Sequence, residues 1–294
     1  MFKRHKDINT LVSDIYGTLS DGVELTEDQA AEFGKRMAKM IKNRLSVPTS
    51  ETENKLRMSN TGSKCDRKLW YTVNMPGTAE PLAPNTKLKF LYGDMVELLV
   101  LFLAEVSGHT IEGAGDALEV AGVPGHRDAI IDGILIDVKS ASGFGYGKFK
   151  FHKLEHEDPF GYLSQLGNYL QGSKDDPKVE VKTEAGFLAV DKEQGHICLD
   201  MYKFKELEKI PERLEAKKEM VCSKSPPPRA YMDKLQSAKG NRELGVECSY
   251  CVFKKECWPG LRTFIYSSGP KFLTHVVMAP NVPEVINGEI KENF

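Results

Sequence analysis

The sequence lacks any run of about 18 consecutive apolar residues, the length typical of a helix that crosses a bilayer. It also lacks an apolar stretch behind its basic start, Met-Phe-Lys-Arg-His-Lys, and a secretory signal requires such a stretch. No membrane partner is therefore expected. Together the two absences predict a cytoplasmic protein.

The chain carries almost no net charge for its 294 residues. Its 40 Lys and Arg residues nearly balance its 42 Asp and Glu residues, which leaves a formal net charge of −2. The overall charge therefore gives no general attraction to polyanions such as nucleic acids, and any such contact must come from local basic patches. The apolar fraction of 40% and the charged fraction of 28% are ordinary for a globular protein with a core.

Cysteine is sparse and unevenly placed. Without a secretory signal, the six cysteines are expected to be thiols or metal ligands rather than disulfides. Cys248, Cys251 and Cys257 follow the pattern C-x2-C-x5-C, a tight trio that leaves one ligand missing from a four-cysteine site. Cys65 or Cys222 would complete such a site, which suits an iron–sulfur cluster or a structural zinc.

Residues 125–139 are expected to form a β-hairpin. Asp132-Gly133 is typical of a two-residue hairpin turn, because both central residues of that turn need positive φ. The turn fixes which residues are opposed: Ile131 with Ile134, Ile130 with Leu135, Ala129 with Ile136, and Asp128 with Asp137. One face of the hairpin is then apolar, and the other carries charged side chains at its open end.

Asp128, Asp137 and Lys139 share that charged face. Like charges directly opposed in a sheet destabilise it, and a divalent cation between them is the simplest remedy. Two carboxylates and a backbone carbonyl such as that of Val138 are hard oxygen ligands, which favour Mg²⁺ or Mn²⁺ over Zn²⁺. The plain alternative is an exposed hairpin end with ordinary surface charges.

Two helices carry further candidates. Residues 90–107 predict a helix that is apolar on nearly every side and therefore buried, with Glu97 in its middle and Gly93 one turn earlier. A buried carboxylate must be paired, hydrogen-bonded or metal-bound. Gln165 and Tyr169 are spaced to share one face of a second helix.

The segment 143–153 is expected to be a loop that interleaves aromatic and basic residues. Aromatic rings stack on bases and lysines neutralise phosphates, so this composition favours a single nucleic-acid strand. The alternative interpretation of residues 143–153 is a surface loop whose aromatic rings pack on the core. Nearer the N-terminus, Thr26 and Gln29 form a capping-box pattern that begins an amphipathic basic helix.

Taken in order, these motifs resemble the RecB-like branch of the PD-(D/E)XK nuclease superfamily. The resemblance covers roughly residues 63–260 and is greatest to its iron–sulfur members, such as the CRISPR-adaptation nuclease and phage exonucleases. It rests on the following pieces: Cys65-x-Arg67, Gly93-x3-Glu97, Gly125-x2-Asp128, Asp137-x-Lys139, Gln165-x3-Tyr169 and Cys248-x2-Cys251-x5-Cys257. Because cysteines stand at both ends of the series, this order of motifs is specific for the iron–sulfur nucleases of that branch.

The resemblance implies an α/β core with a mixed sheet flanked by helices, plus a helical cysteine-cluster subdomain. It implies hydrolysis of DNA phosphodiester bonds, usually from single-stranded ends. The implied roles are metal binding for Glu97, Asp128 and Asp137, catalysis for Lys139, and site shaping with DNA contact for Gln165 and Tyr169. A [4Fe–4S] cluster would join Cys65 to the C-terminal cysteines. Many relatives have histidine where Glu97 stands.

The expected organisation has three parts: an N-terminal helical extension over 1–62, the nuclease domain over 63–260, and a C-terminal tail over 261–294. The basic helix in the extension would guide DNA or bind a partner. The resemblance also allows a homo-oligomer or a recombination or replication partner, and a location in the host cytoplasm if the chain is phage-encoded. Two alternatives stay open: a DNA-binding adaptor module with a vestigial acidic site, and the same nuclease with zinc on its four cysteines.

Overall fold

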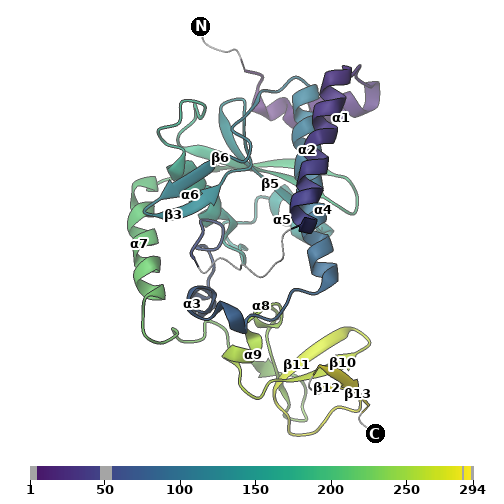
Figure 1. The fold of residues 1–294 in the computed structure, drawn as a ribbon, viewed down its shortest axis with the longest axis vertical. Helices are drawn as coiled ribbons and strands as arrows, with labels where there is room; N and C mark the ends of the chain where they lie inside the picture. Colours follow the sequence, from purple (N-terminus) through teal and green to yellow (C-terminus); the bar gives the residue numbers. More distant parts are fainter. Residues whose placement is uncertain (1–4, 47–54, 287, 293–294) are drawn as a thin grey trace. The chain divides into compact units, whose positions relative to one another are not determined.

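The structure is a computed structural model that describes residues 5–46, 55–286 and 288–292, and the chain forms two compact units (Figure 1). Within the described ranges, the first unit holds residues 5–46, 56–63 and 83–218, and the second unit holds the remainder. A division between the units falls after Ser63, one residue from the predicted boundary at 62, and none falls at 260. The N-terminal helices belong to the first unit, and the residues beyond 260 belong to the second.

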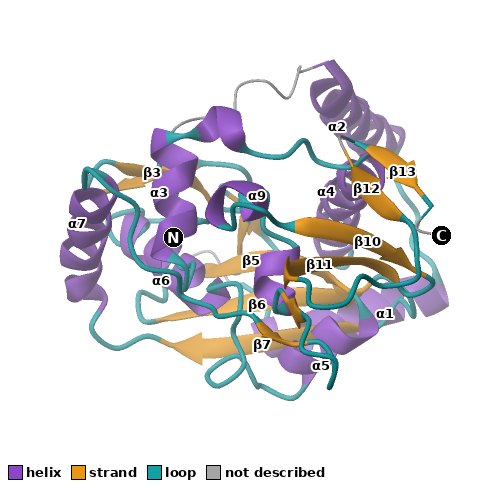
Figure 2. Cartoon of the chain, turned by 90° about the horizontal axis from the view of Figure 1, so that it is seen from below, coloured by secondary structure: helices purple, strands orange, loops and turns teal. Residues whose placement is uncertain are grey.

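A five-stranded mixed sheet forms the centre of the first unit. Its strands, in spatial order, are β1 (Ile111–Glu112), β4 (Ala129–Ile131), β5 (Ile134–Ala141), β6 (Glu184–Asp191) and β7 (Ile197–Lys203). Only β5 and β6 are parallel, and α5 (Gly143–Lys150) and α6 (Tyr162–Gly172) lie in the crossover that a parallel pair requires. Figure 2 shows β5, β6 and β7 side by side. The predicted α/β class with a mixed sheet is confirmed.

The β4–β5 hairpin has the predicted register. Ala129, Ile130 and Ile131 pair with Ile136, Leu135 and Ile134, and both turn residues have positive φ, 49° at Asp132 and 77° at Gly133. The first predicted strand is interrupted, however. Residues 123–126 form β3 (Val123–His126) against β2 (Ala117–Val120), and β4 begins only at Ala129. The buried Arg127 lies between the two strands and donates to Asp116 and Asp176, which fixes the chain where it passes from one sheet to the other.

The apolar face of the hairpin packs against helices from the N-terminal part of the chain. Its core combines strand residues such as Ile136 and Leu188 with residues of η1 (Ile8–Thr10), α1 (Leu11–Asp21) and α4 (Pro84–Val106). Complete burial of the helix predicted over 90–107 is wrong. Val100, Leu101 and Ala104 are buried, whereas Phe90, Met95 and Leu99 are exposed. Only the second half of α4 lies on the sheet.

Helix α2 (Glu27–Ser46) begins with the predicted capping box. The Gln29 backbone N–H donates to Thr26 Oγ1 at 3.2 Å, and the Thr26 N–H donates to Gln29 Oε1 at 3.0 Å. The helix packs on α4 through Phe33 and Phe102, whose ring centroids are 4.5 Å apart. The N-terminal extension is therefore part of the first unit's packing.

The loop predicted over 143–153 is wrong for most of its length, because residues 143–150 form helix α5. Ser142 Oγ accepts a hydrogen bond from the Gly145 N–H and caps the first turn. Tyr146 and Phe149 are buried, and Phe149 packs edge-on against Phe187 at 5.4 Å. Tertiary packing therefore overrides the low helix propensity of three glycines. η3 (Leu207–Lys209) and α7 (Ile210–Val221) follow β7.

The second unit has its own six-stranded sheet, in the order β13-β12-β10-β11-β9-β8. These strands are β8 (Lys234–Leu235), β9 (Arg242–Glu243), β10 (Arg262–Tyr266), β11 (Gly269–His275), β12 (Glu284–Ile286) and β13 (Glu289–Lys291). The unit's helices are α3 (Asp66–Asn74), η2 (Pro76–Thr78), α8 (Val246–Ser249) and α9 (Lys254–Cys257). The segment expected to be a tail thus supplies β10 to β13.

Within the described ranges, none of the helices is both long and apolar enough to cross a membrane.

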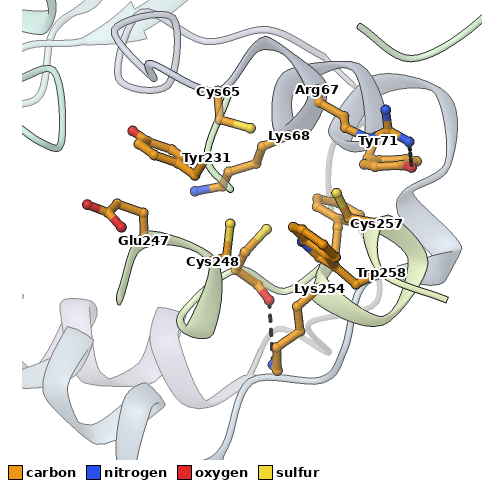
Figure 3. A pocket seen from close by; sticks show the side chains of 12 residues that line it. Cys65, Arg67, Lys68, Tyr71, Tyr231, Glu247, Cys248, Lys254, Cys257 and Trp258 are labelled. Atoms are coloured by element: carbon orange, nitrogen blue, oxygen red, sulfur yellow. Dashed lines mark hydrogen bonds between the residues drawn. The ribbon is translucent and has the colours of Figure 1, made fainter. Parts of the chain in front are cut away.

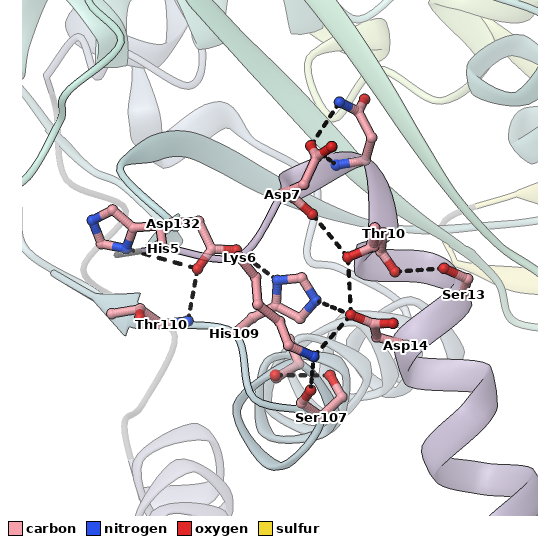
Figure 4. Close-up of polar contacts among 12 residues, drawn as sticks. His5, Lys6, Asp7, Thr10, Ser13, Asp14, Ser107, His109, Thr110 and Asp132 are labelled. Atoms are coloured by element: carbon pink, nitrogen blue, oxygen red, sulfur yellow. Dashed lines mark hydrogen bonds and ion pairs between the residues drawn. The ribbon is translucent and has the colours of Figure 1, made fainter. Parts of the chain in front are cut away.

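A buried histidine joins three segments of the first unit (Figure 4). His109 Nδ1 lies 2.5 Å from an Asp132 carboxylate oxygen, and its Nε2 lies 3.2 Å from Asp14 Oδ2. The Thr110 backbone N–H donates to Asp132 at 2.9 Å, and the Lys6 ammonium pairs with Asp14 at 2.9 Å. The N-terminal segment, the end of α4 and the β4–β5 turn are therefore held together by polar contacts.

Replacing His109 by alanine is expected to lower the free energy of unfolding by about 1–3 kcal/mol, because the buried Asp132 carboxylate loses a partner. Urea denaturation measures this loss. Lys6→Ala is the matched control, since its half-exposed ion pair is expected to contribute less than about 1 kcal/mol. Equal losses in the two variants would contradict this account of the network.

Candidate functional site

The predicted carboxylates and lysine converge in the first unit. Asp137 lies on β5 and is almost fully buried, with its side chain on the face opposite the apolar core. Asp128 directly precedes β4, and its Oδ2 accepts a hydrogen bond from the Val138 N–H at 2.7 Å. The two aspartates are thus neighbours, although the pairing of β4 with β5 begins one residue later at Ala129.

Lys139 lies against Asp137 and forms an ion pair with its Oδ2. Its ammonium also lies 5.0 Å from the centre of the Tyr162 ring, within cation–π range. Burial lowers the pKa of Lys139, but the charges of Asp137 and Asp128 raise it by more, so the net pKa is above its ordinary value. The ammonium therefore stays protonated at neutral pH.

Gln165 and Tyr169 reach the same group from α6. The Gln165 amide Nε2 lies 3.1 Å from Asp137 Oδ1 and 3.0 Å from the Tyr169 hydroxyl. Burial and the charge of Asp137 raise the pKa of Tyr169 to about 12, so its hydroxyl stays protonated while it accepts from the Gln165 amide. The predicted one-turn spacing therefore brings both side chains to the carboxylates.

Glu97 reaches the group from α4. Burial, then the charges of Asp137 and Asp94, raise the pKa of Glu97 to about 7. Burial and the charges of Asp137 and Glu97 likewise raise the pKa of Asp128 well above its usual range. Burial raises the pKa of Asp137, and the Lys139 ammonium offsets part of that shift. Glu97 therefore keeps its proton in part at neutral pH.

Sequence reasoning missed two residues beside Glu97. Arg44, in the last turn of α2, binds Asp94 through both Nε and Nη2, and the Nη2 to Oδ1 distance is 2.7 Å. Asp94 lies one turn before Glu97, so that spacing was visible in the sequence. Its partner Arg44 was not, because 50 residues separate the two.

The donor chemistry of the group fits a divalent cation. All three carboxylates supply hard oxygen ligands, and Asp137 Oδ2 is buried without a hydrogen bond, leaving the ion pair with Lys139 as its polar contact. As they stand, no three His, Cys, Asp or Glu side chains among the described residues form a group that could hold a metal ion. Cation binding would therefore require the carboxylate side chains to rearrange. The Val138 carbonyl stays a predicted ligand.

Four cysteines line one pocket of the second unit (Figure 3). Cys65 directly precedes α3, whereas Cys248, Cys251 and Cys257 come from the region of α8 and α9. Burial and then the neighbouring thiols Cys251, Cys257 and Cys65 raise the pKa of Cys248 to about 11. Cys65, not the exposed Cys222, is therefore the fourth cysteine of this pocket.

Two side chains with N–H groups also line the cysteine pocket. Arg67 Nε has no hydrogen-bond partner among the described residues, and the Trp258 side chain hydrogen-bonds to Cys248 and so lowers the pKa of that thiol in part. N–H donors beside several thiols suit a group whose sulfur atoms accept hydrogen bonds. The sequence pattern Cys65-x-Arg67 includes one of these two donors.

Comparisons with known proteins give only distant structural likenesses. The sequence matches no protein-family model and no curated protein. One similar solved structure is that of SSO0001, with a TM-score of 0.40, 16% identity, and coverage of 74% of this chain and 91% of that chain. Another is LHK-Exo in complex with dAMP, with a TM-score of 0.38, 13% identity, and coverage of 58% of this chain and 91% of that chain. Likenesses at this level assign neither a family nor a role.

Proposed function

We propose that this chain is a Mg²⁺- or Mn²⁺-dependent deoxyribonuclease that hydrolyses phosphodiester bonds from single-stranded DNA ends. The observation that carries the proposal is the gathering of Glu97, Asp128 and Asp137 around Lys139 in the first unit. Carboxylates buried together are unfavourable unless protons or a cation offset their charge. The sequence motifs that resemble RecB-like nucleases contain these same four residues.

The chain's residues have distinct tasks in this proposal. A cation held by Glu97, Asp128 and Asp137 would neutralise phosphate charge and lower the pKa of an attacking water. The Lys139 ammonium would stabilise the negative charge that develops on the phosphate oxygens. Gln165 orients Asp137, and the protonated Tyr169 hydroxyl supports Gln165.

Single-stranded DNA is proposed as the substrate because of the surface around α5. Phe144 and Phe151 are 82% and 65% exposed, which is unusual for rings of this size. Lys148 lies 5.4 Å from the Phe144 ring, and Lys150 lies 5.8 Å from the Phe151 ring. Exposed rings beside ammonium groups offer stacking for bases and charge for phosphates.

Digestion of end-labelled DNA tests the proposal. With Mg²⁺ or Mn²⁺ the full chain should degrade linear single strands and spare circular ones, and EDTA should stop the reaction. Asp128→Asn should remove the activity, whereas Asp175→Asn, at an exposed position, should retain it. Full activity in the Asp128→Asn variant would contradict the proposed centre.

We further propose that Cys65, Cys248, Cys251 and Cys257 hold a [4Fe–4S] cluster. Four thiols around one pocket, with the Arg67 and Trp258 side chains beside them, support this assignment. The cluster would join α3 to the α8–α9 region within the second unit.

Anaerobic purification is expected to give a brown protein with about four iron and four sulfide per chain. Cys251→Ser should lose the iron, because one of four thiolate ligands is removed. Cys222→Ser is the matched control, since that exposed thiol lies outside the pocket. A colourless protein that contains zinc would exclude the cluster.

A further inference from the structure

A groove of about 590 Å³ follows the free edge of β7 in the first unit. It is lined on one side by Asn9 and Val12 and on the other by Lys150 and His152, with β7 residues between them. None of the predicted site residues lies in it. Its polar lining is dominated by one histidine and the carboxylate that holds it.

His152 is fixed by three features. Its Nδ1 lies 2.6 Å from Asp200 Oδ1, and its ring stacks on Tyr202 with the centroids 4.4 Å apart. The second Asp200 oxygen accepts a hydrogen bond from the Tyr202 hydroxyl at 2.6 Å. The backbone of His152 has a φ of 52°, which is uncommon for residues other than glycine. The ring is thus held in one orientation.

The opposite ring nitrogen is available to a ligand. The Asp200 side chain is 3% exposed whereas that of His152 is 52% exposed, and no partner of His152 Nε2 is found among the described residues. A histidine that donates from Nδ1 to a carboxylate can donate from Nε2 to a second acceptor only as an imidazolium. Together with the Lys150 ammonium, this arrangement suits an anionic ligand.

The strand register places this pair beside the proposed centre. Asp137 on β5 pairs with Phe187 on β6, and Phe187 pairs with Asp200 on β7, so all three side chains point to one face of the sheet. Two strand spacings separate Asp137 from Asp200, which is about 10 Å.

We infer that His152, oriented by Asp200, and Lys150 form a second phosphate-binding site, which holds the backbone of a single strand away from the cleavage centre. The inference deepens the proposed function and rests on it for the nature of the strand. The neighbouring Phe151 ring is exposed beside Lys150 and Lys153, where it can stack on a base of the same strand.

Binding of a short fluorescent single-stranded oligonucleotide in EDTA tests the site without cleavage. His152→Asn keeps a donor for Asp200 and tolerates the positive φ, but it removes Nε2. The dissociation constant of the His152→Asn variant for the oligonucleotide should be roughly tenfold higher than that of the parent. Lys150→Ala should lower the slope of log K against log salt by about 0.7. His156→Asn and Lys209→Ala, at exposed positions, are the matched controls and should bind like the parent.

Equal affinities for His152→Asn and His156→Asn would overturn the site. Loss of inorganic phosphate or dAMP binding with unchanged oligonucleotide binding would overturn the assignment to a strand. Cleavage assayed on the same preparations with Mn²⁺ keeps the two proposals apart. A protein that cuts no DNA but binds it through His152 would refute the nuclease and retain this site.

Discussion

Lys139→Met is expected to lower the rate constant for metal-dependent DNA cleavage roughly 10²–10³-fold, the loss typical of removing one preorganised charge-stabilising group. Methionine nearly matches the length of the lysine stem, so the packing against Tyr162 is retained while the ammonium is lost. Lys139→Arg is also expected to be strongly impaired, because the planar guanidinium does not fit the place of a compact ammonium beside Asp137. Single-turnover cleavage of end-labelled DNA measures the effect.

The matched control for Lys139 is Lys203→Met, a change to an exposed lysine at the end of β7 in the same sheet. Its cleavage rate should stay within about twofold of the parent, because exposed ion pairs contribute little. Circular dichroism and urea denaturation should show that Lys139→Met remains folded. An undiminished rate in that variant would remove Lys139 from the proposed mechanism.

Glu97→Gln is expected to stabilise the metal-free protein at alkaline pH. The pKa of Glu97 is about 7 in the folded chain and near its ordinary value of 4.5 in the unfolded chain. The folded state therefore binds the proton more tightly, so stability falls as the pH rises from about 4.5 to about 7. The full difference corresponds to roughly 3 kcal/mol, and glutamine removes it because it does not ionise.

Urea denaturation in EDTA at several pH values measures this difference. Above about pH 7.5 the Glu97→Gln variant should be more stable than the parent, and the two curves should converge near about pH 4. Glu119→Gln, at an exposed position, is the control and should follow the parent. Mn²⁺ should stabilise the parent at alkaline pH and affect Glu97→Gln less. Parallel pH curves for the parent and Glu97→Gln would contradict the buried-carboxylate account.

The β4–β5 hairpin was predictable because its determinants are local. The Asp132-Gly133 turn and the period-two alternation of apolar residues fix the register and the faces without knowledge of the rest of the chain. Gln165 was placed correctly beside Tyr169 for the same reason, since a helix sets that spacing. Their approach to Asp137, however, was expected only from the resemblance.

The missed features depend on distant partners. Arg44 meets Asp94 across 50 residues, and nothing near either residue signals the other. Helix α5 forms over three glycines because Tyr146 and Phe149 gain burial that only the tertiary structure reveals. The ordered strands beyond residue 260 likewise follow from long-range pairing, for example Thr263 with Val285. The pairing of His152 with Asp200 was also not predictable, because 48 residues separate the two.

The central claim is that the carboxylates around Lys139 form a divalent-cation site, and titration calorimetry with Mn²⁺ tests it most directly. The account predicts that the parent chain binds Mn²⁺ and that Asp137→Asn weakens this binding at least tenfold, while Asp175→Asn leaves it unchanged. Asp137 is decisive because its carboxylate is the most deeply buried of the group and contacts both Lys139 and Gln165. Equal Mn²⁺ affinity in the parent and Asp137→Asn, or no binding by either, would contradict the account.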